Sequence, residues 1–520
     1  MLAFTALSTP RDDGQTLVEP GAEKLAALVV DNGRRLGGAD CEIHGRSLVE
    51  LRAAVRSAVV GQLGDTPVVV TGHQPELYHA GVWAKNFVAS RLAAAAGGRG
   101  VNLIVDNDAP KKTTLTVPHR RDEMLATREL SFADYRVGWA FEQYDALDAE
   151  AGLRFIQEIR TALGDDAYDA SSMGLIAPAL TGESGSRDLV DQVTDGRKAV
   201  EAGFGIDLVE RRVSQCWAGP LLLDILLNAP RFAACYNAAL ADYRAALGLS
   251  GTKRPVPDLV EEAGRVELPV WVYRHSRERR RLFVERAGDK VTFHAQTTPM
   301  GSLGVDDLKQ EDGMARLAAV IGWRFRPRAI TLTLWARLLL ADLFVHGIGG
   351  AKYDRITDRL IERYLGIEPP AMACVSATLL MPLDRFAVDR AASLSARRRV
   401  RDVRYNPNRY LSAITGDLSE LLQRRVDAIA ESDRLRSEDR LNRPARRQAF
   451  ESIRRTNADL LTVDPGLVDR LSAQAHRIED QLAHNRVADS REYFFGLLPK
   501  SKLDQLADAL PSVEHLRGRG

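Results

Sequence analysis

The sequence predicts an α/β protein with a parallel sheet in its core, helical insertions and a long α-helical coiled-coil arm near the C-terminal end. Three observations support this prediction: a strand, helix, strand pattern near residue 100, an apolar region with a glycine-rich turn near residue 345, and regularly spaced leucines amid dense charge after residue 384. We therefore expect five regions: the first half of the core (1–150), a mainly helical connecting region (151–265), the second half of the core (266–383), the arm (384–490) and a C-terminal segment (491–520).

The first half of the core begins with a short strand. Residues 67–70 are rich in β-branched side chains and end in Thr71-Gly72, and residues 81–92 have helical periodicity that glycines stop at 97–98. Residues 101–105 then form a second buried strand. A strand, helix, strand unit has a right-handed connection, so these two strands should be parallel neighbours.

The second half of the core changes pattern twice. Residues 268–273, 281–284 and 291–293 alternate as short antiparallel strands do. Residues 329–344 are apolar and suit a buried helix, or a strand followed by a helix, and residues 345–352 form a sharp turn. Helical spacing resumes over 353–365, and residues 372–380 can supply another strand.

The arm is predicted from an apolar stripe that runs through charged sequence from Leu418 to Leu461. A helix there should be broken or kinked near Pro444. A second helix, residues 467–482, can fold back after Asp464-Pro465-Gly466 to form an antiparallel pair. Such an arm has little core of its own, so we expect it to dock on a second copy of the chain as a homodimer.

Composition excludes several classes of partner. The chain has 520 residues, of which 71 are basic and 70 acidic, so it carries no global charge that would attract nucleic acid or an anionic membrane. Its four cysteines lack CxxC spacing, which argues against a zinc site or a disulfide framework. No apolar run reaches the roughly 18 residues of a membrane span, and the N-terminal residues lack a signal-peptide pattern. We expect a cytoplasmic protein that acts on a small molecule and binds no metal.

The first candidate site is Thr71-Gly72-His73-Gln74, which comes at the end of a strand and shortly before a helix. Ligands of open α/β sheets bind at the carboxyl ends of the strands, where loops and helix N-termini meet. Gly72 permits close approach of the backbone, His73 and Gln74 can donate hydrogen bonds to a phosphate or carboxylate, and Lys85 lies one turn inside the helix. The alternative is that the histidines only cap and brace the helix start.

The second candidate site is Asp106-Asn107-Asp108, at the end of the next strand. Its carboxylates can bind a substrate ammonium, act as a general base or hold a divalent metal. Asp and Asn also form ordinary turns after strands, which is the alternative.

The third candidate site is the glycine-rich turn of Gly347, Gly349 and Gly350, followed by Lys352. Its backbone amides can cradle an anion. The spacing matches neither a P-loop nor a dinucleotide-binding fingerprint. We interpret the neighbouring His346 as a core histidine.

Taken in order, these segments resemble the bacillithiol biosynthesis cysteine-adding enzyme family over residues 65–510. VVTGHQ (69–74) looks like the family's strand and TGQQ-type turn, with His73 in place of a glutamine, and the acidic strand end DND (106–108) falls where the family has a longer acidic group. LPVWVY (268–273) resembles its hairpin, FRPRA (325–329) with the glycine turn resembles its FSPN-type entry, and REYFF (491–495) resembles its closing segment.

The resemblance implies a Rossmann-like core, a coiled-coil dimerisation arm and a ligase that joins cysteine or another amino acid to an amino-sugar conjugate. In such an enzyme His73, Gln74 and the glycine turn would bind phosphate or carboxylate, Lys85 or Lys352 would neutralise negative charge, and Asp106 or Asp108 would orient or deprotonate the amine. The acyl group needs activation, for which ATP or another nucleotide is a candidate. Two alternatives stay open: a nucleotidylyltransferase, and a noncatalytic dimeric scaffold whose site has decayed.

Overall fold

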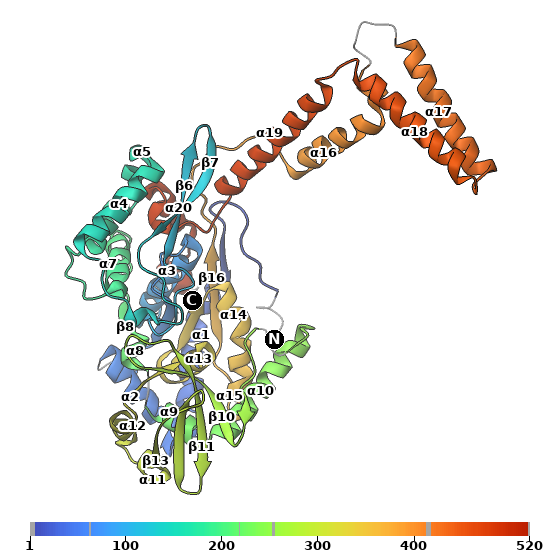
Figure 1. Ribbon diagram of the computed structural model, residues 1–520. Coiled ribbons are helices and arrows are strands. Elements are labelled where there is room, and N and C mark those ends of the chain that lie inside the picture. Colours follow the sequence, from blue (N-terminus) through green and yellow to red (C-terminus); the bar gives the residue numbers. More distant parts are fainter. Residues whose placement is uncertain (1–5, 62–63, 218, 252–254, 412–417, 518–520) are drawn as a thin grey trace. The chain divides into compact units, whose positions relative to one another are not determined.

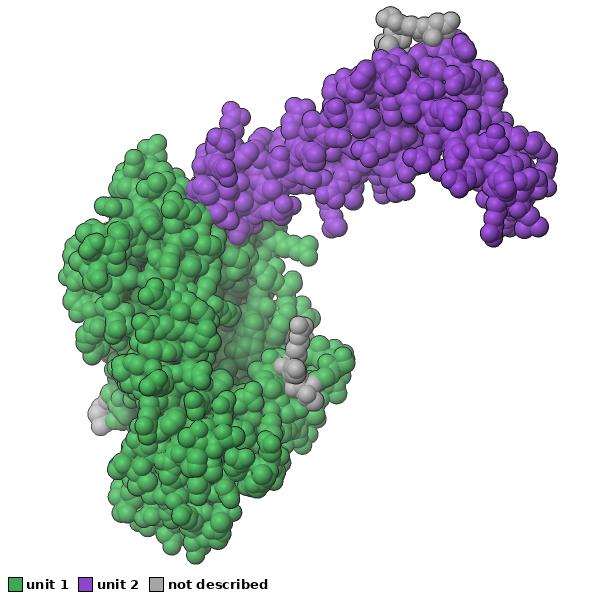
Figure 2. All heavy atoms as spheres, in the orientation of Figure 1, with its two compact units in different colours: residues 1–117, 128–381, 491–520 green, residues 118–127, 382–490 purple. Residues whose placement is uncertain are grey.

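The computed structural model describes residues 6–61, 64–217, 219–251, 255–411 and 418–517. Residues 1–5, at the start of the segment for which no signal peptide is predicted, lie outside the described residues. The chain forms two compact units. Unit 1 comprises residues 1–117, 128–381 and 491–520, and unit 2 comprises residues 118–127 and 382–490 (Figure 2). Unit 2 is therefore an insertion, because the chain returns to unit 1 at Arg491.

In the described residues, unit 1 is built on a six-stranded sheet of which five neighbouring strands are parallel. In spatial order these are β8 (Val209–Arg212), β5 (Arg99–Ile104), β4 (Val68–His73), β15 (Leu343–His346) and β16 (Met372–Ala377). At one edge, β1 (Thr16–Glu19) pairs antiparallel with β16. The chain fills the sheet from β4 outwards, first through β5 to β8 and later through β15 to β16. The strand order consequently reverses between β4 and β15.

The first predicted unit is confirmed. β4 and β5 are parallel, with Val69 opposite Gly100, and α3 (Ala80–Ala95) connects them. Residues 68–70 are fully buried because both faces of a parallel sheet are covered, which explains why the strand is a continuous apolar run and does not alternate. α3 packs on β4, β5 and β16 and is buried almost all round, which suits its small alanine side chains (Figure 1).

The order of elements in 329–344 differs from both predicted options. The segment begins with α13 (Ala329–Trp335), continues as the π-helical turn η2 (Ala336–Leu340) and ends in β15, which includes residues 345 and 346 of the predicted turn. Asp342 ties the start of β15 to β4, because its amide donates to the Val68 carbonyl and its Oδ2 accepts from the Val68 amide. α14 (Ile348–Tyr353) and α15 (Arg355–Leu365) follow, and β16 confirms the strand predicted within 372–380.

The connecting region is largely helical, as predicted, and its described residues add two short strands that were not predicted, β8 and β9 (Glu261–Glu262). Its helices are α4 (Ala149–Leu163), α5 (Asp165–Ala170), α6 (Met173–Leu180), α7 (Leu189–Ala202), α8 (Val213–Cys216), α9 (Pro220–Leu227) and α10 (Ala229–Ala246), after the short helix η1 (Phe141–Gln143).

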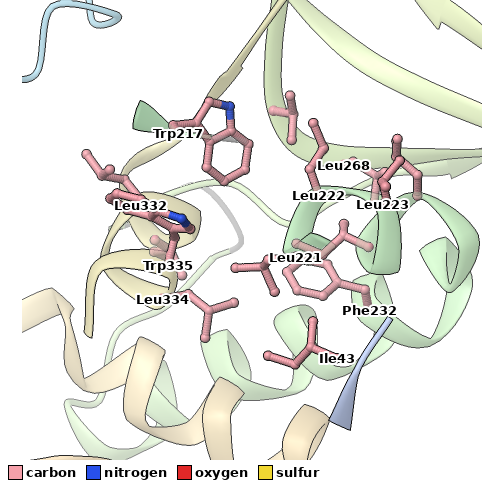
Figure 3. Close-up of a cluster of buried hydrophobic side chains, with 14 of the residues drawn as sticks. Ile43, Trp217, Leu221, Leu222, Leu223, Phe232, Leu268, Leu332, Leu334 and Trp335 are labelled. Carbon is pink, nitrogen blue, oxygen red and sulfur yellow. The ribbon is translucent and has the colours of Figure 1, made fainter. Parts of the chain in front are cut away.

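A second, antiparallel sheet confirms the three strands predicted between 268 and 293. It consists of β13 (Thr298–Gly304), β12 (Lys290–Ala295), β11 (Arg280–Ala287), β10 (Arg265–Tyr273) and β14 (Arg324–Pro327), with β9 (Glu261–Glu262) beside β10. Two short helices, α11 (Val305–Lys309) and α12 (Gly313–Ile321), precede β14. The main core joins this sheet to α9, α10 and α13 through Leu222, Phe232, Leu268 and Trp335 (Figure 3).

The ends of unit 1 contain elements that the sequence did not predict. They are α1 (Ala22–Gly37), β2 (Glu42–Ile43), β3 (Arg46–Ser47), α2 (Leu48–Val60), η4 (Phe495–Leu497), α20 (Lys500–Ala509) and α21 (Val513–Arg517), and the hairpin of β6 (Thr114–Arg121) and β7 (Met124–Ser131) spans the boundary between the units.

Unit 2 is helical as predicted, with one additional described helix before the predicted ones. Its described helices are α16 (Arg390–Tyr405), α17 (Ser419–Glu438), α18 (Arg443–Leu461) and α19 (Leu467–Ala488), with η3 (Pro407–Arg409) after α16. α17 and α18 form one helical pair, and α19 packs mainly on α16 (Figure 1). The predicted break near Pro444 is confirmed, because α17 ends at Glu438 and α18 begins at Arg443, with the proline in the first turn of α18, where no amide donor is needed. Among the described helices, none has the length and apolar character to span a membrane.

Candidate functional site

A cavity of about 630 Å³ lies in unit 1 at the carboxyl ends of the parallel strands. Gly72 and His73 of β4 and His346 of β15 contribute to its wall, and the residues that follow β5 and β15 complete that side. These two central strands flank the point where the strand order reverses. Open α/β sheets bind their ligands in the crevice at this point, so the cavity is the candidate site of this protein.

Other walls come from elements far away in the sequence. α3 contributes its first turns, the antiparallel sheet contributes the end of β14, and the segment that follows unit 2 contributes two charged side chains; these residues are His79, Gly81, Val82, Lys85, Trp271, Pro327, Arg328, Arg491 and Glu492. The cavity thus lies between the carboxyl ends of the central strands and cationic side chains from three separate parts of unit 1.

Lys85 is the most unusual charged group of the cavity. Its side chain is 3% exposed, and its Nζ donates a hydrogen bond to the carbonyl oxygen of Gly72 at 2.7 Å. Among the described residues, no carboxylate lies within ion-pair distance of that Nζ. Burial lowers the pKa of Lys85 to about 7. Since a buried ammonium without a counter-charge is costly, this position is suited to an anionic ligand.

His73 is neutral at physiological pH. Its Nδ1 lies 3.1 Å from the carbonyl oxygen of Gln74, and because a carbonyl only accepts, Nδ1 carries the ring proton. Burial and the nearby Lys85 lower the pKa of His73 to about 3. The ring therefore offers an acceptor at Nε2 and does not serve as the phosphate-binding cation.

The acidic strand end is divided between the core and the cavity. Asp106 is fully buried, accepts hydrogen bonds from the amide and hydroxyl of Ser214, and is not among the residues lining the cavity; burial raises its pKa to about 6. This placement gives Asp106 a structural contact in place of the expected contact with an amine. Asp108 does line the cavity, where Gln74 Nε2 and Arg279 Nη1 donate to its carboxylate at 3.0 and 2.6 Å.

Asn107 also lines the cavity, and its carboxamide has a defined orientation. Nδ2 donates to the carbonyl oxygen of Pro327 at 2.8 Å, while Oδ1 has no partner among the described residues. Because Nδ2 carries a second hydrogen, this contact orients Asn107 and leaves one amide donor for the predicted ligand contact.

The glycine turn after β15 belongs to the cavity as predicted. Gly347, Gly349 and Gly350 line it, whereas Lys352 does not. His346, expected in the core, also lines the cavity. Thr71 does not line it, because its hydroxyl donates to the carbonyl of Val345 at 3.0 Å and so joins β4 to β15.

Arg491 and Glu492 are cavity residues that the sequence did not reveal. Arg491 Nη2 lies 3.3 Å from His79 Nδ1, and burial lowers the pKa of Arg491. Gly81 leaves the space for it, because a Cβ there would lie 2.2 Å from Arg491 Nη2. The aromatic residues that follow Arg491 are the sequence feature that marks this contact, because Phe495 stacks on Trp83 of α3 with ring centroids 4.3 Å apart.

Comparison of the sequence with protein-family models and with curated proteins gave no match. The chemistry of the cavity therefore carries the argument about function. In the described residues, no group of three or more His, Cys, Asp or Glu side chains is placed to hold a metal ion. The cavity is lined by the cationic side chains of Lys85, Lys111, Arg328 and Arg491, by the carboxylates of Asp108 and Glu492, and by the imidazoles of His73 and His79, whose pKa values burial lowers. With its cations in excess, this lining suits a small molecule that carries negative charge.

Proposed function

We propose that this protein is an enzyme that forms an amide bond between an amino acid, cysteine in the first instance, and an amino-sugar conjugate. The observation that carries the proposal is Lys85, a buried lysine in the cavity whose ammonium has no carboxylate partner among the described residues. A carboxylate or phosphate of the substrate would supply the missing counter-charge. Such a group accompanies both an amino acid and an activated acyl group.

The fold supports the same proposal. Numbered along the chain, the five parallel strands have the spatial order 3-2-1-4-5, which is the order of a Rossmann-like core. The ordered segments that resemble the bacillithiol biosynthesis cysteine-adding enzymes include the turn after β4 and the glycine turn after β15, and both line the cavity. We propose the cytoplasm as the location.

In the proposed reaction, the amine attacks the acyl carbon, the C–N bond forms, the leaving group departs and the amine loses a proton. Lys85 neutralises the negative charge that develops on the acyl oxygen or leaving group. Asp108, held by Gln74 and Arg279, orients the attacking amine. ATP or another nucleotide is the proposed source of acyl activation, with the turn from Gly347 to Gly350 next to its phosphates.

The direct test is to incubate the protein with cysteine and an amino-sugar conjugate, with and without ATP, and to search by mass spectrometry for a product equal to both substrates minus one water. We expect product from the wild type and a loss of about a hundredfold in Lys85→Met. Lys198→Met is the matched control, because Lys198 lies exposed on α7. Absence of product and of any ligand-induced thermal shift in the wild type would favour the noncatalytic scaffold.

A nucleotidylyltransferase is the second candidate, favoured by the glycine turn beside cationic groups in one cavity. Exchange of labelled pyrophosphate into a nucleoside triphosphate, without amide product, would identify it.

We propose that unit 2 joins two copies of the chain. Val426 on α17 and Phe450 on α18 are large apolar side chains that are more than half exposed. A symmetric dimer is the commonest way to cover such a surface. Light scattering should give twice the mass of 57.3 kDa, and a monomeric mass at micromolar concentration would exclude the dimer.

A further inference from the structure

His346 has two differently placed ring nitrogens. Nε2 lies 3.0 Å from Asp354 Oδ2, so the carboxylate faces this nitrogen of the ring. Nδ1 makes no hydrogen bond to the described residues and lies beside Gly350, which together with His346 lines the cavity. The ring is held from one side by Phe344, with centroids 4.4 Å apart.

Asp354 is kept ionised by its surroundings. Arg337 Nη1 donates to Asp354 Oδ2 at 2.8 Å, and both side chains are almost completely buried. Although burial acts to raise it, the pKa of Asp354 is lowered chiefly by the charge of Arg337. In the neutral ring, a carboxylate beside Nε2 favours the tautomer that has its proton on Nε2 and its acceptor at Nδ1.

Gly350 keeps Nδ1 open. A Cβ at position 350 would lie 2.9 Å from His346 Nδ1, closer than real Cβ contacts, whereas a Cβ at Gly349 would meet nothing within 4 Å. Both glycines belong to α14, where alanine is compatible with the backbone. The two positions therefore differ mainly in whether a methyl group covers the ring nitrogen.

We infer that His346 Nδ1 accepts the proton that the attacking amine loses, and that Asp354 is the positioning residue that sets the protonation of the ring. The amine nitrogen bonds to an acyl carbon activated as a mixed anhydride by a nucleoside triphosphate, the bond to the phosphate leaving group breaks, and the amine proton moves to Nδ1 and then to solvent. The role of His346 as proton acceptor rests on the proposed function, whereas the protonation state of its ring does not.

The first test is chemical modification of the full-length protein with diethylpyrocarbonate, with the rate at His346 followed by peptide mass spectrometry. Wild type and Gly349→Ala should be modified at the same rate, and Gly350→Ala at least about tenfold more slowly, because its methyl group covers Nδ1. An unreactive His346 in the wild type, or equal rates in the two glycine variants, would overturn the inference.

The second test is nitrogen-15 NMR of histidine-labelled protein, with His346→Asn to assign the signals. Nδ1 should be unprotonated and Nε2 protonated in the wild type, and Asp354→Asn should abolish this preference, which a merely structural role would not change. A protonated Nδ1 in the wild type would overturn the inference.

The third test is the condensation reaction itself. His346→Asn and Gly350→Ala should lower kcat at least about a hundredfold and leave KM within a few fold, because the lost step is proton transfer. Unchanged kcat in His346→Asn would exclude the proposed role. If the wild type forms no amide, the proposed function fails, and the modification and NMR measurements still decide whether the ring is open and unprotonated at Nδ1.

Discussion

The Nζ of Lys85 and the carbonyl oxygen of Gly72 lie 2.7 Å apart, and this is the one hydrogen bond that the described residues give the ammonium. An ammonium has three donors. Two of them are therefore left for a ligand in the cavity, in a position where water is largely excluded.

Replacing Lys85 with methionine should separate stability from binding. We expect the free energy of unfolding at pH 6 to stay equal or to rise by about 1–2 kcal/mol, because the variant removes a buried charge without a counter-charge. Binding of an anionic ligand should weaken at least about tenfold. Urea unfolding and calorimetric titration measure the two effects. A variant that is clearly less stable than the wild type would show that Lys85 is a structural residue.

The pH dependence of stability should reveal the titration of Lys85. Its pKa of about 7 in the folded state is below the value of 10.5 for a free lysine, so between these values the unfolded chain binds more protons than the folded one. Stability of the wild type relative to Lys85→Met should therefore rise with pH from 7 to about 10, by at most about 1.4 kcal/mol per pH unit. Below pH 7 the difference should be constant. Parallel curves over the whole range would contradict the lowered pKa.

Gly81 should not tolerate a side chain. In Gly81→Ala the added Cβ would lie 2.4 Å from the carbonyl oxygen of Ala377, which is backbone and cannot easily move, as well as against Arg491. We expect a loss of about 2–3 kcal/mol in the free energy of unfolding. Gly174→Ala, in a helix where a Cβ meets nothing within 4 Å, should instead be neutral or stabilising. Equal stability of the two variants would refute the close packing at Gly81.

Arg425 should be a main stabilising residue of unit 2. Its Nε donates to Asn457 Oδ1 of α18, and its Nη2 donates to the Tyr405 carbonyl and to Asn406 Oδ1 after α16. Arg425→Ala should speed hydrogen exchange in α17 and α18, corresponding to a loss of about 2–3 kcal/mol.

The neighbouring Arg424 is the control for that experiment. It makes one ion pair with Asp459 and is about half exposed, so Arg424→Ala should change exchange by no more than about 0.5 kcal/mol. Similar exchange in both variants would mean that the buried hydrogen bonds of Arg425 do not stabilise unit 2.

The central strands were predictable because their local pattern is strong. Residues 68–70 form a continuous apolar run that only a buried strand explains, and α3 has an uninterrupted helical segment. β15 was harder, because its start depends on Asp342, a single residue whose partner Val68 is 274 positions away. Helical periodicity likewise identified the arm but could not show that α19 packs on α16, since the pattern of one helix does not specify its neighbour.

The candidate site was predictable where its residues directly follow strands. Gly72, His73 and the glycine turn fulfil that condition, and they line the cavity. Asp106 fulfils it as well, yet its partner Ser214 lies in a helix that no local pattern links to β5. Arg491 could not be predicted, because it reaches the cavity through tertiary packing against His79, 412 positions earlier.

The insertion of unit 2 has a consequence for synthesis of the protein. Gly72 and His346 leave the ribosome early, then residues 382–490 emerge, and only afterwards do Arg491 and Glu492 complete the cavity wall. A ligand that binds the finished cavity cannot stabilise the nascent chain before that point. Until the insertion has been translated, a ligand of the complete cavity therefore contributes nothing to the stability of unit 1.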